Sequence, residues 1–179
     1  HGYTTGAFVS AFVLDRRFGL DEGFDVYDDH LVDGAGTDDL GPEERRGEAT
    51  VVRALEFVDR AGDQPCFLWV HLFDAHAPYE APKAFATTER APYDAEVAYV
   101  DHCVGQLLEG LNARGRGSDA LVSVVADHGE GLGEHGERTH TLFLYDTTMH
   151  VPWIVWSGDR LPRGRVVEPP VRRRRAGEL

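Results

Sequence analysis

Cysteine is scarce in this sequence, and long apolar runs are absent. Cys66 and Cys103 are the two cysteines, and because no C-x-x-C spacing occurs they exclude a disulfide scaffold, a zinc knuckle and a dithiol redox motif. The longest apolar stretches, such as residues 120–126, have the length of a strand, well short of the ~18 residues that cross a bilayer. What is present, 42% hydrophobic residues in a chain of 179, is enough to pack the core of one ordinary domain.

Positive charge is also scarce over most of the chain. The net charge is −13, but residues 160–179 hold seven arginines against two glutamates, which leaves −18 for residues 1–159. An acidic body does not attract nucleic acid through its phosphates, so nucleic-acid binding is excluded as the main function. The chain begins at His1 and its one methionine is Met149, so we read it as a fragment whose own N-terminus lies upstream.

Two segments have the apolar spacing of helices. These are residues 44–61, which Gly62 is expected to end, and residues 93–111. Residues 1–29 predict a strand or short helix that leads into a loop. The acidic, glycine-containing segment 21–48 predicts a solvated connection.

Three short runs rich in β-branched or aromatic residues predict strands over residues 66–73, 120–126 and 151–156. Because these strands alternate with the predicted helices, the sequence predicts an α/β fold with a largely parallel central sheet.

The densest group of chemically active side chains is DHGEGLGEHGERTH, residues 127–140, directly after a predicted strand. Open α/β sheets bind ligands at the carboxyl ends of their strands. Asp127 and His128 would reach one metal or two neighbouring ones if Gly129 adopts dihedrals that other residues avoid. An oxygen with a nitrogen ligand suits Ca, Mg, Mn or Zn. The alternative is a polar surface loop with a capping aspartate.

A second polar group, HLFDAHAPY, follows another predicted strand, so it is expected at the same edge of the sheet. We interpret His71 as a core histidine that bonds to main chain, and His76 as a site residue rather than an exposed turn residue. Gly131, Gly133 and Gly136 fit G-x-G-x-x-G, but Glu134 lies inside the motif and no clear helix follows, which argues against a dinucleotide site.

Four segments in order resemble the sulfatase family of the alkaline phosphatase superfamily. They read GYTTGAFVSAFVLD, FLWVHLFDAHAPY, YDAEVAYVDHCVGQLLEGL and LVSVVADHGEGLGEHGERTHTLFLYDTTMHVPWIVW. The resemblance implies that residues 1–160 are part of a catalytic domain, a fragment of an alkaline-phosphatase-like three-layer sandwich with a largely parallel central sheet. Residues 161–179 form an atypical Arg-rich tail, which we interpret as the result of a truncation or frameshift, with a solvated basic tail as the alternative.

The same resemblance implies roles for individual residues. Asp127 and His128 stand where the family binds a divalent cation, usually calcium, with Mg, Mn and Zn as alternatives. His76 and His140 stand where the family has substrate-binding and catalytic groups at the ester anion. His135 is implied to lie beside the ligands without touching metal or substrate. The implied substrate is a sulfate-ester small molecule or a sulfated glycan. The resemblance allows a periplasmic or extracellular compartment, but the sequence itself leaves the compartment open.

The family nucleophile, a formylglycine made from Cys or Ser in C/S-x-P-x-R, has no counterpart here. Phe67 follows Cys66 and Val104 follows Cys103, so neither cysteine fits that motif. The formylglycine and two further metal-binding carboxylates are therefore expected upstream of His1.

Other functions stay open on the sequence alone. One is a phosphatase, phosphodiesterase or phosphoethanolamine transferase of the same superfamily. Another is a non-catalytic metal-binding fragment. A third is a zinc site made by His128, His135 and His140.

The 179-residue chain by itself is expected to have no measurable sulfatase turnover, because no residue in it fits the nucleophile motif. The measurement is hydrolysis of an aryl sulfate with added calcium. Turnover that Asp127→Ala abolishes would show that the nucleophile lies within these residues.

Overall fold

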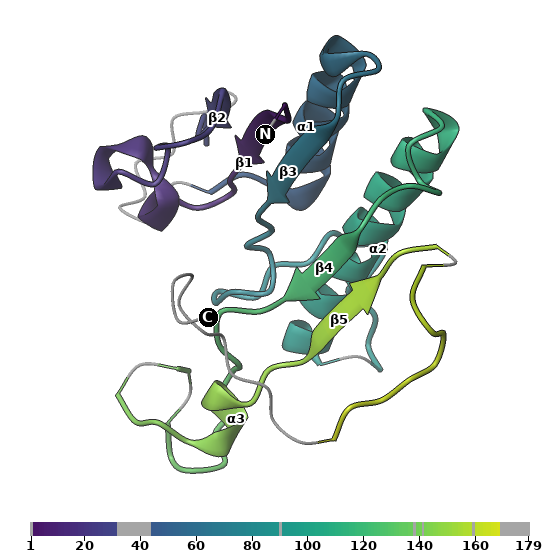
Figure 1. Cartoon of the computed structure of the whole chain (residues 1–179). Coiled ribbons are helices and arrows are strands. Elements are labelled where there is room, and N and C mark those ends of the chain that lie inside the picture. Colours follow the sequence, from purple (N-terminus) through teal and green to yellow (C-terminus); the bar gives the residue numbers. More distant parts are fainter. Residues whose placement is uncertain are drawn as a thin grey trace, which may run out of the picture. The chain divides into compact units, whose positions relative to one another are not determined.

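The computed structural model describes residues 2–31, 44–89, 91–137, 139–140, 142–158 and 160–168. It divides into two compact units, residues 1–117 and 118–179, which are described separately (Figure 1). None of the helices in these described ranges combines the length and the apolar character that a membrane span requires.

The first unit contains a parallel three-stranded sheet. Its central strand β1, Thr4–Phe8, pairs with β2, Val26–Asp28, on one side and with β3, Cys66–Val70, on the other. The parallel α/β architecture predicted from the sequence is thereby confirmed. The strand β2 was not predicted, because three residues are too few to show a period.

Two helices cover one face of this sheet. The helix α1, Gly47–Ala61, follows the predicted spacing closely, with Val51, Ala54 and Val58 buried, and ends at Gly62, whose φ of 57° suits glycine. The helix α2, Pro92–Ala113, packs against α1. Its start agrees with the presence of Pro92, which is tolerated in a first helical turn.

The core of the first unit lies on both faces of the sheet. Phe8 packs against Phe57 of α1 on one face, while Ala7 and Val9 meet a group of aromatic side chains on the other. That group is Phe24, Tyr27 and Trp69. Between β1 and β2 lie two short 3₁₀ helices, η1, Phe12–Leu14, and η2, Arg16–Phe18.

The second unit contains an antiparallel strand pair. The strands are β4, Val122–Val125, and β5, Trp153–Trp156, and the short helix α3, Asp146–Met149, lies between them in sequence. Both strands were predicted, and they run antiparallel, which a largely parallel sheet allows. A parallel return needs a crossover that places the chain at the start of the first strand, and none of the described connecting residues forms one.

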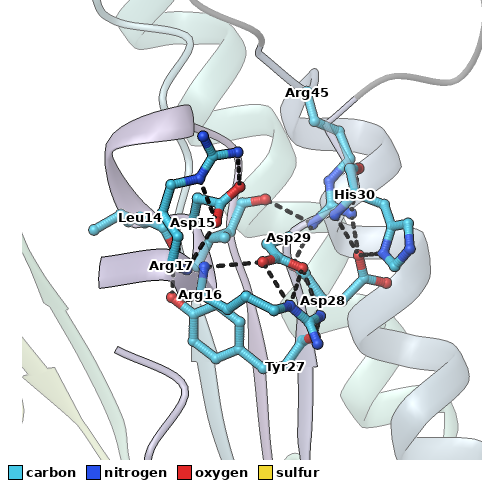
Figure 2. A network of polar contacts seen from close by, with 10 residues as sticks. Leu14, Asp15, Arg16, Arg17, Tyr27, Asp28, Asp29, His30 and Arg45 are labelled. Atoms are coloured by element: carbon cyan, nitrogen blue, oxygen red, sulfur yellow. Dashed lines mark hydrogen bonds and ion pairs between the residues drawn. The ribbon is translucent and has the colours of Figure 1, made fainter. Parts of the chain in front are cut away.

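The connection predicted as solvated contains a buried cation. Arg45 is 6% exposed, and its guanidinium donates to the Asp28 carboxylate at 2.7 Å, to the Val9 carbonyl at 2.8 Å and to the Thr50 hydroxyl at 2.9 Å. These partners come from β2, from the residue after β1 and from α1. Figure 2 shows Arg45 beside Asp28. Arg45 therefore joins three elements, and the expectation that residues 21–48 are solvated is wrong at this position.

A second ion pair closes the connection between β1 and β2. Arg16 donates to the Asp29 carboxylate through Nη2 at 2.6 Å and Nε at 2.9 Å, and its main-chain N–H adds a bond of 3.0 Å (Figure 2). The hydrogen bonds from the Arg16 side chain lower the pKa of Asp29 to about 2. Because this pKa lies below the ordinary value of 3.8, the folded state favours the ionised form of Asp29 more strongly than the unfolded chain does.

Arg45→Met is expected to destabilise the protein by about 3–5 kcal/mol, because it removes the charged partner of the Asp28 carboxylate and the side-chain donor to the Val9 carbonyl. The measurement is urea unfolding. Arg60→Ala is the control, since among the residues the structure describes Arg60 pairs only with exposed Glu56, at 3.9 Å, and its loss should cost less than about 0.5 kcal/mol. Equal stability of the two variants would contradict the role given to Arg45.

Candidate active site

Asp127 and His128 lie just after β4, and their side chains are neighbours. The Asp127 carboxylate is 81% exposed, and its Oδ2 lies 3.7 Å from His128 Nε2. The Nδ1 atom of His128 lies 2.8 Å from the Gly129 carbonyl, to which it donates. Ligand atoms at about 2.0–2.6 Å from one ion are commonly 3–4 Å apart, so this pair fits as two neighbouring ligands of a divalent cation.

Gly129 serves this loop by its size. Its φ is not positive, so the expectation that it supplies dihedrals other residues avoid is wrong. Its N–H donates to the Thr148 carbonyl at 2.8 Å, and an added Cβ would clash with the carbonyl of Thr147. The close approach of the loop to α3 therefore requires glycine here.

His140 lies against His128. Their rings stack with centroids 3.9 Å apart and planes at 28°, and His140 Nδ1 lies 3.0 Å from Glu130 Oε1. The structure therefore brings together three of the predicted residues, Asp127, His128 and His140. Sequence reasoning missed Glu130 as their partner. Its one signal was its place in the polar run that begins at Asp127.

His135 does not stack with these histidines. Its ring lies on Tyr145, with centroids 3.9 Å apart and planes at 19°. Across the described ranges, no three His, Cys, Asp or Glu side chains are placed to hold a metal together, so the three-histidine zinc site finds no support. Asp127 and His128 fit a metal that takes its other ligands from elsewhere.

His76 belongs to the first unit and lies in the loop after β3. Its Nδ1 is 2.7 Å from the Ala77 carbonyl, and its ring stacks on Phe73 at 4.3 Å. The Asp74 carboxylate anchors the same loop by accepting from the Gly47 N–H at 2.9 Å, at the start of α1. The convergence of His76 with the residues of the second unit stays a prediction.

His71 differs from the site histidines in the role of its ring. The Ser10 N–H points to His71 Nδ1 at 3.5 Å, which supports the interpretation that main chain satisfies this half-buried ring. A nitrogen that accepts leaves the ring hydrogen on Nε2.

A buried acidic residue lies close to Arg46, which also pairs with Asp74 of the His76 loop. Glu96 of α2 is 1% exposed, and neither of its carboxylate oxygens has a hydrogen-bond partner in the described part of the chain. Arg46 Nη1 lies 3.7 Å from Glu96 and 3.4 Å from Asp74. Burial raises the pKa of Glu96 to about 7, and burial likewise raises the pKa of Asp74.

The comparison with known families decides the assignment. A sequence model of the Sulfatase family matches residues 1–174. This chain belongs to the sulfatase family. The resemblance first noted in its motifs is thereby confirmed.

Relatives of this sulfatase-family chain include enzymes of two kinds. It is 34% identical to human iduronate 2-sulfatase over 92 residues, which are 51% of this chain and 16% of the relative. It is 31% identical to the phosphoethanolamine transferase EptA of Salmonella typhimurium over 90 residues, 49% of this chain and 16% of the relative. The chain thus covers 16% of the length of each of these two relatives.

The fold is shared with solved structures of the superfamily. EptA from Neisseria meningitidis, an integral membrane protein, superimposes with a TM-score of 0.67 at 19% identity, over 88% of this chain and 32% of that one. At this identity the likeness shows the fold alone. The predicted fragment of an alkaline-phosphatase-like sandwich agrees with it.

The buried Glu96 is expected to make stability depend on pH. Its folded pKa of about 7 exceeds the ordinary 4.5, so the folded state holds the proton more tightly and stability falls as pH rises between these values. Glu96→Gln should flatten this fall and raise stability at pH 8 by about 1–3 kcal/mol. The measurement is urea unfolding from pH 4 to 8.

Glu109→Gln, at an exposed position on the same helix, is the matched control and should reproduce the wild-type curve. A Glu96→Gln curve that keeps the wild-type fall would assign the pH dependence to other groups.

Proposed function

We propose that this chain forms the part of a sulfatase-family hydrolase that binds the metal and the ester anion, in an enzyme that cleaves sulfate esters. The observation that carries the proposal is the grouping of Asp127, His128 and His140, with Oδ2 and Nε2 of the first two 3.7 Å apart and the two imidazoles stacked. The substrate is a sulfate-ester small molecule or a sulfated glycan, a class supported by the family and by relatives named as sulfatases.

Asp127 and His128 would hold the cation. Because His128 donates from Nδ1 to the Gly129 carbonyl, its Nε2 carries the lone pair, as a metal ligand requires. The cation would supply neutralisation of the negative charge on the ester oxygens. A carboxylate oxygen suits calcium, which we propose as the metal, with Mg, Mn and Zn as alternatives.

His76 and His140 would act on the ester itself. Their Nδ1–H groups are taken up by the Ala77 carbonyl and the Glu130 carboxylate, so each ring is assigned to donate to the sulfate oxygens from Nε2 when that nitrogen carries a hydrogen as well. One of these Nε2–H groups is assigned to protonate the leaving alcohol. Positioned donors of this kind stabilise charge that develops in the transition state. The attacking hydroxyl is assigned to a formylglycine outside these 179 residues.

A second candidate is transfer of phosphoethanolamine. The observation that favours it is the likeness to EptA of Salmonella typhimurium. Sulfate and phosphate esters share a tetrahedral anion, so the same ligands and histidines would serve either reaction. The identity of the nucleophile distinguishes them, since the sulfatase needs a formylglycine and the transferase a Thr or Ser outside the C/S-x-P-x-R motif.

In the complete protein that carries this chain, His76→Ala and His140→Ala are each expected to lower kcat/KM for an aryl sulfate by roughly tenfold to ten-thousandfold. The reason is loss of a positioned donor or of the group that protonates the leaving alcohol. His71→Ala should act mainly through stability, because its ring bonds to the main chain. Activity on the sulfate ester and on a matched phosphate ester is measured in parallel.

Two exposed histidines provide matched controls. His102→Ala changes a histidine of the first unit, and His150→Ala changes one of the second, and both should keep wild-type kcat/KM. Preference for the phosphate ester in the wild type would favour the second candidate. Silent His76 and His140 variants would overturn the site assignment.

A further inference from the structure

Glu130 is a buried carboxylate in the candidate site that has no role in the function proposed so far. Its side chain is 6% exposed, although Asp127 and Glu134 of the same glycine-rich loop are exposed. Burial of a carboxylate is costly unless hydrogen bonds compensate for the lost water. Glu130 has such bonds, since Oε1 accepts from the Gly131 N–H at 3.0 Å and lies 3.0 Å from His140 Nδ1.

The bond between Glu130 and His140 fixes the ring of His140. A carboxylate oxygen accepts, so Nδ1 of His140 carries the hydrogen in this contact. The carboxylate is itself held by the next N–H in the chain, at Gly131. Gly131 lies close to the Thr139 carbonyl, so that an added Cβ would be 2.8 Å from its oxygen. The residues next to Glu130 and next to His140 are therefore in contact as well.

A second contact restrains the same ring in another direction. The ring of His140 lies on the ring of His128, with 3.9 Å between centroids. The hydrogen bond fixes which ring nitrogen of His140 faces Glu130, whereas the stacking restrains the plane of the ring. Together they couple the orientation of His140 to the position of the residue proposed to bind the metal.

We propose that Glu130 is a positioning residue for His140: it holds Nδ1–H and thereby directs Nε2 to the ester, where Nε2 donates when it carries a hydrogen as well. This inference rests on the proposed function for the role of His140, but the hydrogen bond itself is independent of it. An imidazole without such a partner samples both tautomers and several rotations, so fewer molecules present the required atom. Partners that orient functional histidines typically contribute tenfold to hundredfold in activity or affinity.

The experiment uses Glu130→Ala and Glu130→Gln in the complete protein, with two measurements. The first is the ¹⁵N chemical shifts of the His140 ring, which report the tautomer whether or not the substrate is known. The second is kcat and KM for the aryl sulfate. Wild type should show His140 with hydrogen on Nδ1, and Glu130→Ala should show a mixture of tautomers with kcat lowered roughly tenfold to hundredfold and KM changed less than about threefold.

Glu130→Gln should retain the Nδ1–H tautomer and most of kcat, because an amide oxygen also accepts a hydrogen bond. Glu134→Ala is the matched control. Glu134 lies in the same loop and accepts from the Leu132 N–H at 2.8 Å, but its side chain is exposed. It should leave the tautomer and kcat unchanged. Unfolding midpoints of all variants separate loss of orientation from loss of the fold.

Two results would overturn the inference. One is an unchanged His140 tautomer in Glu130→Ala. The other is an equal loss of kcat in Glu130→Ala and Glu134→Ala, which would assign the effect to the loop as a whole. Failure of the proposed function can be told apart from these results. A wild type without sulfatase activity would disprove the function, while the ¹⁵N shifts would still report whether the His140 tautomer depends on Glu130.

Discussion

The buried guanidinium of Arg45 is the interaction on which the first unit depends. At the carboxyl edge of a parallel sheet, main-chain carbonyls beyond the last strand pairing have no partner within the sheet. If that edge is buried, these carbonyls need donors from elsewhere. Arg45 supplies them to Val9 and Asp28, and it contacts Thr50 of α1, whose hydroxyl also lies 2.6 Å from that of Ser10. The carboxyl edge of the sheet is therefore held by charge-assisted bonds, and the loop with His76 starts from this edge.

In the second unit, close contacts between main-chain segments hold the loop after β4 in place. The loop after β4 is held to α3 through the bond from Gly129 to Thr148, and its far end returns to Gly131. Both positions exclude a Cβ because carbonyl oxygens occupy its place. Gly131, one of the three glycines that fit the dinucleotide motif, serves this packing because the absence of a side chain leaves room for the Thr139 carbonyl.

The sequence was sufficient for those features that depend on local order. Helices α1 and α2, strands β3 to β5 and the placement of Asp127 and His128 after a strand all follow from periodicity and from short apolar runs. The direction of β5, the strand β2 and the burial of Arg45 depend on pairing between distant segments, about which periodicity says nothing. The contact of Glu130 with His140 is of the same kind, because it spans ten residues of irregular chain.

The histidines of the two units share one hydrogen-bonding arrangement. In His76 and His128 the Nδ1 atom faces the carbonyl of the following residue, and in His140 it faces a carboxylate. Each of these partners accepts, so all three rings carry hydrogen on Nδ1, whereas His71, which accepts from the main chain, has the opposite tautomer. The bonds in His76 and His128 are local and follow from loop geometry, but His140 needs a residue brought from elsewhere. The Nδ1–H tautomer leaves a lone pair on Nε2, which is what the metal role proposed for His128 requires, whereas the donor roles proposed for His76 and His140 require a hydrogen on Nε2 as well.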